Sequence, residues 1–150
     1  LRHTGPIQWT NMDVSKNGQY NVDLSGMQVN GTNVRANFGP VMIDSGTTYT
    51  FLEWDAYHDL MNAITRYCYM VHYGPAMQRL QPLCGETDIY DSRCWYLQNS
   101  FLLRNFPDIQ VLFGTLTTNW VPSAYMYRNG SDRWCYAFQP AGRTILGASW

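Results

Sequence analysis

The chain of 150 residues has little charge, a single lysine and no long hydrophobic run. Charged residues make up 14% of it and nearly cancel to a net charge of -1, so no basic surface is available to bind nucleic acid. No apolar run approaches the roughly 18 residues of a transmembrane helix. These absences exclude a nucleic-acid-binding protein and a membrane span within this chain.

Metal-site spacing is also missing. The four cysteines are Cys68, Cys84, Cys94 and Cys135. No two of them form a Cys-x-x-Cys pair, and the three histidines lie in no zinc pattern, so we expect no metal and no cofactor. An even count of cysteines without metal spacing favours two disulfides and an oxidising compartment. The Asn-x-Ser/Thr sequons at Asn30 and Asn129 agree with this and are candidate glycosylation sites.

What the sequence does contain is a strand pattern around one helix. Apolar residues at steps of three and four predict a helix over about residues 53–71, with acidic residues at its start, and Gly74 and Pro75 beyond it. The Asn30-Gly31 dipeptide predicts a hairpin turn. Strands are predicted at 20–24, 27–29, 41–43, 109–113, 119–125, 134–138 and 144–150. We expect one mostly β domain over residues 1–150. The chain opens on Leu1 rather than methionine, which suggests a fragment or a processed chain.

Asp44 is the only charged residue between Arg35 and Glu53. A carboxylate among apolar neighbours is costly to bury unless hydrogen bonds satisfy it. The residues that follow it supply hydroxyl groups and, at Gly46, a closely approaching backbone. A bare Asp-Ser-Gly is most often an Asx turn at the end of a strand, so the tripeptide alone leaves a structural role open.

The longer run 41-VMIDSGTTYTFL-52 resembles the active-site motif of the pepsin-like aspartic proteases. Residues Ile145, Leu146 and Gly147 resemble the element of this family that crosses beneath the catalytic loop. The segment 106-FPDIQVLF-113, between Cys94 and Cys135, resembles the disulfide region of the C-terminal lobe, and 20-YNVDLSGMQVNG-31 resembles the run before the second motif. The resemblance spans nearly the whole chain and implies a C-terminal lobe of a bilobal protease, without the N-terminal lobe and the closing strands.

Three aromatic strings suggest a subgroup. The strings RCWYL, NWVPSAYMY and RWCYAF are similar to plasmepsin V and its apicomplexan relatives, and in part to nepenthesin-like plant enzymes. This implies processing of secretory or exported proteins, in the ER or Golgi lumen or after secretion, with a membrane anchor possible outside this chain. Of the three connectivities that four cysteines allow, the resemblance favours Cys68–Cys84 and Cys94–Cys135. A free Cys68 on the apolar helix face is the alternative.

The resemblance also implies a mechanism. In this family two aspartates, one from each lobe, share a proton and activate a water molecule, without metal or covalent intermediate. Asp44 is one of them by motif, Ser45 braces the loop, and Gly46, Thr47 and Thr48 contact the dyad or the substrate. Because alternate strand residues share a face, Met42 is expected to line the cleft and Ile43 to pack inward.

No second Asp-Thr/Ser-Gly occurs, and the nearest, Asp91-Ser92, is followed by Arg93. We therefore expect an aspartic endopeptidase acting on a peptide or protein substrate, with an N-terminal lobe as the partner that supplies the second aspartate. The isolated chain is expected to be inactive. Two alternatives stay open: a retropepsin-like homodimeric protease, and a catalytically dead protease-like binding or inhibitor protein.

Overall fold

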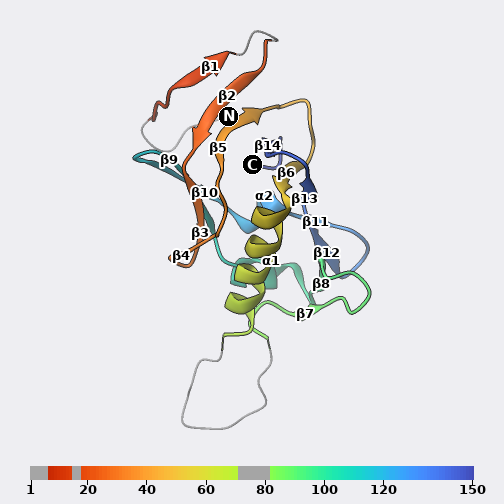
Figure 1. Ribbon diagram of the computed structural model, residues 1–150. Coiled ribbons are helices and arrows are strands. Elements are labelled where there is room, and N and C mark those ends of the chain that lie inside the picture. Colours follow the sequence, from red (N-terminus) through yellow and green to blue (C-terminus); the bar gives the residue numbers. More distant parts are fainter. Residues whose placement is uncertain (1–6, 15–17, 71–81) are drawn as a thin grey trace.

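The computed structural model describes residues 7–14, 18–70 and 82–150 (Figure 1). Within these ranges the chain is mostly β, with one main helix. A six-stranded sheet has the order β1-β2-β5-β14-β6-β13. Its strands are β1 (Met12–Val14), β2 (Tyr20–Leu24), β5 (Gly39–Ile43), β6 (Thr50–Glu53), β13 (Phe138–Ala141) and β14 (Ile145–Leu146).

Two four-stranded sheets complete the domain, in the orders β10-β9-β3-β4 and β11-β12-β8-β7. The first contains β3 (Gly26–Val29), β4 (Thr32–Asn33), β9 (Ile109–Phe113) and β10 (Leu116–Trp120). The second contains β7 (Glu86–Thr87), β8 (Cys94–Tyr96), β11 (Met126–Arg128) and β12 (Arg133–Tyr136). In Figure 1 the main helix, α1 (Trp54–Cys68), runs down the middle of the view between these two sheets.

The predicted strand pattern and hairpin in the first third of the chain are confirmed. Val22 and Leu24 are buried in β2 while Asp23 between them is exposed, as a period of two requires. At the turn between β3 and β4, Asn30 has a φ of 48° and Gly31 a φ of 75°. Asn and Gly are the residues that tolerate this left-handed conformation, which is why the pair marks a tight hairpin.

The predicted helix is correct in place but too long at both ends. Glu53 is the last residue of β6 and caps the helix rather than belonging to it. At the other end the Cys68 carbonyl accepts a hydrogen bond from the Leu83 backbone N–H, at 2.7 Å, and Cys68 is bonded to Cys84. This cross-link anchors the last helical turn where the amphipathic pattern alone would continue. Val71 lies outside the described residues.

Two strand predictions near the C-terminus are wrong in part. Residues 119–120 end β10, but Pro122–Tyr125 form a helical turn, α2, that Pro122 starts because proline suits the first helical position. Within 134–138 the strand breaks at Ala137, whose N–H donates to the Tyr125 carbonyl, so β12 and β13 enter different sheets. Of 144–150, only Ile145 and Leu146 are in a strand. A short 3₁₀ helix at Ser100–Asn105 was not predicted.

Aromatic side chains fill much of the core. Trp95, Trp120, Tyr125, Tyr136 and Phe138 are all at most 2% exposed. Their rings pack in contact, for instance Tyr136 and Phe138 with centroids 4.7 Å apart. The prediction that most aromatic residues serve packing fits these positions, whereas Trp9 and Trp54 are exposed.

Candidate functional site: an aspartate at the end of a central strand

Asp44 lies where three strands of the large sheet meet. It directly follows β5, and β14 lies between β5 and β6. β14 runs parallel to β5, with Ile145 opposite Met42, and antiparallel to β6, with Ile145 opposite Phe51. The Asp44 backbone N–H donates to the Leu146 carbonyl at 2.9 Å. The Ile145–Gly147 element therefore runs beside the acidic loop and supports it.

Both oxygens of the Asp44 carboxylate accept hydrogen bonds from the residues that follow. The Gly46 N–H donates to Oδ1 at 3.0 Å, and the Thr47 hydroxyl donates to Oδ2 at 2.5 Å. The Thr47 hydroxyl and then the Gly46 N–H lower the pKa of Asp44 below its ordinary value, because both favour the charged form. None of the described basic residues forms an ion pair with it. The Asx turn is thus present, and it leaves the carboxylate partly exposed.

Two glycines allow the loop and its support to approach closely. A Cβ on Gly147 would lie 2.1 Å from the Tyr49 carbonyl oxygen and 2.7 Å from that of Thr47, distances that no side chain tolerates. A Cβ on Gly46 would lie 3.2 Å from Asp44 Oδ1. Next to Gly147, the Ala148 N–H donates to the Thr47 carbonyl at 2.7 Å. These contacts require a glycine at position 147, whereas the Gly46 contact is tight but only with the Asp44 side chain.

The other predicted site residues flank this loop. Ile43 packs against the core, as predicted, and Met42 is partly exposed. Ser45 and Thr48 are exposed. Their contacts with a substrate or with a second lobe stay predictions, because both partners lie outside this chain.

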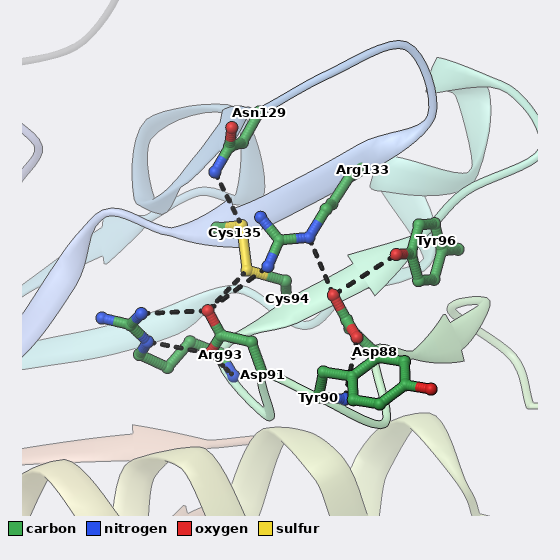
Figure 2. Close-up of polar contacts among 9 residues, drawn as sticks. All are labelled: Asp88, Tyr90, Asp91, Arg93, Cys94, Tyr96, Asn129, Arg133 and Cys135. Atoms are coloured by element: carbon green, nitrogen blue, oxygen red, sulfur yellow. Dashed lines mark hydrogen bonds and ion pairs between the residues drawn. A yellow bond between two sulfur atoms is a disulfide. The ribbon is translucent and has the colours of Figure 1, made fainter.

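Sequence reasoning missed a cluster of charged residues, in which two aspartates and two arginines lie beside the Cys94–Cys135 disulfide (Figure 2). Arg133 Nε lies 2.8 Å from Asp88 Oδ2, and its Nη2 lies 3.3 Å from Asp91 Oδ2. Arg93 binds both Asp91 oxygens at 2.9 Å. The Arg93 side chain, ahead of the other contacts, lowers the pKa of Asp91 to about 2.

Asp88 is 5% exposed, and its pKa is lowered first by Arg133 and next by the Tyr90 N–H. The signal available in the sequence was the run Asp88, Asp91 and Arg93 beside Cys94. Arg133, however, is 40 residues further along, beside Cys135. Only the fold shows that these charges form one cluster.

The two disulfides join Cys68 to Cys84 and Cys94 to Cys135, the pairing that the resemblance implies. Disulfides are typical of proteins in oxidising compartments and fit a secretory or extracellular protein. In residues 7–14, 18–70 and 82–150, no group of three His, Cys, Asp or Glu side chains could hold a metal ion. None of the helices in those ranges is long and apolar enough to cross a membrane.

Comparison with known families decides the relationship. The profile described as "Xylanase inhibitor C-terminal" matches residues 19–149. The chain belongs to the xylanase inhibitor C-terminal family. The fold of this family is that of a pepsin-like C-terminal lobe, so the predicted fold class is confirmed. No curated protein sequence matches the chain.

Solved structures share the fold at low identity. Basic 7S globulin from soybean has a TM-score of 0.65 and 18% identity, covering 93% of this chain and 36% of that protein. Conglutin gamma, a basic 7S globulin from lupine seeds, has a TM-score of 0.64 and 18% identity, covering 93% of this chain and 35% of that one. The chain thus spans about a third of the length of these two proteins. The findings concern neither plasmepsin V nor nepenthesin, and that subgroup stays a prediction.

Proposed function

We propose that this chain supplies one catalytic aspartate, Asp44, to a pepsin-like aspartic endopeptidase. The observation that carries the proposal is the Asp44 loop. Its carboxylate is partly exposed, both its oxygens accept hydrogen bonds from Gly46 and Thr47, and the loop rests on the Ile145–Gly147 element. A structural turn needs the Gly46 contact, but it does not need a neighbouring strand, β14, that bonds to the loop.

The hydrogen bonds at Asp44 suit proton transfer. Because they favour the ionised carboxylate, Asp44 is fitted to accept a proton from a water molecule that attacks a peptide carbonyl. A second carboxylate brought close by an N-terminal lobe would be forced to keep its proton, since two like charges so near cannot both ionise. That protonated group would polarise the scissile carbonyl. Residues 1–150 alone are expected to be inactive, because the second aspartate is not among them.

A second candidate is a protease-like binding or inhibitor protein without catalysis. The comparisons favour it over the first, because the matched family is named for a xylanase inhibitor and both solved structures are globulins. The intact Asp44-Ser45-Gly46-Thr47 motif and its geometry favour catalysis instead. The match of residues 19–149 to a C-terminal family, together with their C-terminal lobe fold, argues against the retropepsin-like homodimer.

The finer features of the proposal follow from the sequence motifs. They are a peptide or protein substrate, loop bracing by Ser45, substrate contacts by Met42 and Thr48, and plasmepsin V-like processing in the secretory pathway. Asn30 and Asn129 are both exposed, which supports them as glycosylation candidates.

The test uses the full-length protein. Binding of a statine peptide, which imitates the tetrahedral intermediate, is measured at acidic pH together with hydrolysis of a peptide library. Catalysis predicts that both occur and that both are lost in Asp44→Asn, while the control Asp91→Asn keeps them. If the wild-type protein neither hydrolyses peptides nor binds statine, the endopeptidase proposal fails and the binding protein stands.

A further inference from the structure

Two hydroxyl groups, one on the buried Thr50 and one on the partly buried Ser149, lie close to the Asp44 loop. Thr50, the first residue of β6, is fully buried, and its Oγ1 lies 3.1 Å from Oγ of Ser149, which is 99 residues away in the sequence. Thr50 Oγ1 accepts a hydrogen bond from the Gly147 N–H at 3.2 Å. Ser149 Oγ accepts one from the Thr50 N–H at 3.0 Å and donates to the Ala137 carbonyl at 2.9 Å. The pair therefore connects three separate segments of the chain.

The contacts of the segment 146–149 alternate along it. Leu146 and Ala148 bond the backbone of Asp44 and Thr47, at the front of the acidic loop. Gly147 and Ser149 bond Thr50, where the loop enters β6. The Trp120 indole N–H also donates to the Ser149 carbonyl. The segment therefore bonds to the loop at its start, at Asp44 and Thr47, and at its end, at Thr50. The Thr50 and Ser149 hydroxyls make the second of these attachments.

Hydroxyl groups are not required here for packing alone. Burial of a hydroxyl is unfavourable unless its hydrogen bonds are made, and an apolar pair of similar shape would pack here without that cost. A fully satisfied polar network does, however, specify one arrangement of the groups that it joins. Gly147 has no side chain and fits closely against the Tyr49 and Thr47 carbonyls, so hydrogen bonds act together with the buried Leu146 side chain to fix the position of the segment.

We propose that Ser149 is a positioning residue: together with Thr50 it holds the segment 146–149 so that Leu146 and Ala148 keep the backbone of Asp44 and Thr47 in place. Ser149 does not contact the carboxylate and acts only through this segment. The inference rests on the proposed role of Asp44 for its functional meaning, whereas its geometry rests on the contacts above.

The test is Ser149→Ala in the full-length protein, with the pH titration of the Asp44 carboxyl followed by carbon-13 NMR. The signal is assigned by its loss in Asp44→Asn. If the Thr47 and Gly46 contacts loosen, the pKa of Asp44 rises toward its ordinary value, because both contacts favour the charged form. The Asp91 carboxyl, which its arginines control, serves as an internal reference and should not move.

A matched pair at Thr50 separates the hydroxyl from the shape. Thr50→Val keeps the shape and removes the hydroxyl, and should raise the pKa of Asp44 as Ser149→Ala does. Thr50→Ser keeps the hydroxyl and should leave the titration near that of the wild type. If Ser149→Ala and Thr50→Val lower only the melting temperature and leave the Asp44 titration unchanged, the positioning role is wrong.

The NMR readout needs no enzymatic activity, so the two proposals fail separately. A protein that never binds statine but shows the shifted titration keeps the positioning role and loses the catalytic one. If the protein is active but the Asp44 titration is the same in wild type, Ser149→Ala and Thr50→Val, the catalytic proposal stands and the positioning role is wrong. If Ser149→Ala does not fold, the comparison of Thr50→Val with Thr50→Ser decides alone.

Discussion

Asp44 and Asp91 both begin an Asp-Ser dipeptide, and both carboxylates accept the backbone N–H two residues on, from Gly46 at 3.0 Å and from Arg93 at 3.1 Å. Beyond that contact the two loops differ. The Asp44 carboxylate accepts a hydrogen bond from the Thr47 hydroxyl, whereas the Asp91 carboxylate accepts hydrogen bonds from the guanidinium groups of Arg93 and Arg133. The pKa is lowered in both, by neutral donors in one and first by a cation in the other.

This difference separates a reactive carboxylate from a structural one. A negative charge held by neutral donors remains uncompensated, so it can share a proton with a second acid. The Asp91 carboxylate, which is paired with two arginines, stays ionised above about pH 2 and does not share a proton. The third residue of each tripeptide matters most: glycine leaves the space in front of the carboxylate open, and arginine fills it with positive charge. The predictions that follow test this contrast.

The largest effect is expected from exchanging the two aspartates for asparagine in the full-length protein. Asp44→Asn should lower kcat for peptide hydrolysis by roughly 100-fold or more, because it removes the proton acceptor, and should leave the fold intact. Asp91→Asn should do the opposite, with unchanged kcat and a lower unfolding midpoint in urea. Equal loss of activity in both variants would remove the contrast between the loops.

A smaller effect, on stability, is expected at the Cys94–Cys135 disulfide beside Asp91. Replacing both cysteines with alanine should lower the free energy of unfolding by about 2–5 kcal/mol. The matched control is the double alanine variant at Cys68 and Cys84. The disulfide that it removes joins residues 16 apart in the sequence, whereas Cys94 and Cys135 are 41 apart. On loop-closure entropy the control should lose about 1 kcal/mol less. The measurement is urea unfolding at neutral pH. The reverse order would show that packing around α1 outweighs loop length.

The sequence predicted the Asp44 side of this comparison better than the Asp91 side. Asp44, its glycine and its hydroxyls are contiguous, and the Ile145–Gly147 element has its own motif, so local patterns were enough. The Asp91 cluster depends on Arg133, which only the pairing of β8 with β12 brings near. The Thr50–Ser149 contact likewise joins residues 99 apart.

Fold errors have two physical origins. The strand period was correct wherever one face is buried and the other exposed, as in β2. It misled at Pro122–Tyr125, where apolar residues serve a buried helical turn and the Tyr125 hydroxyl donates to the Pro107 carbonyl at 2.6 Å. The helical pattern likewise extended α1 too far, because a hydrogen bond and a disulfide to residues 83 and 84 set its end. Contacts with residues 83 and 84 set the end of α1, whereas Pro122 at the first helical position sets the start of α2.

Acid should weaken the two loops through the same linkage, with Asp91 as the clearer case. Its folded pKa of about 2 lies below the ordinary 3.8 of the unfolded chain. The stabilisation is therefore complete above about pH 4 and is lost as the pH falls toward 2. Urea unfolding between pH 6 and pH 2 should show a shallower decline in Asp91→Asn than in the wild type. Parallel curves would mean that Asp91 keeps its ordinary pKa.

The smallest effect is expected from Arg93→Gly, which turns Asp91-Ser92-Arg93 into a second Asp-Ser-Gly. The pKa of Asp91 should rise from about 2, because the first cause of its depression, the Arg93 side chain, is removed. Stability should fall by about 0.5–1 kcal/mol, since the Arg93 side chain is 48% exposed and exposed ion pairs contribute little. Arg93→Ala is the control for the added backbone freedom of glycine. Carbon-13 titration and urea unfolding measure the two changes.

Neither Arg93 variant should hydrolyse peptides or bind statine at this loop, despite the acquired tripeptide. Arg133 would still face Asp91, whereas none of the described basic residues forms an ion pair with Asp44. The Asp-Ser-Gly tripeptide would then be present twice, in one place beside β14 and without a basic partner, and in the other beside an arginine. If Arg93→Gly bound statine through Asp91, the motif alone would make the site, and the support of the Asp44 loop by β14 would have no role in it.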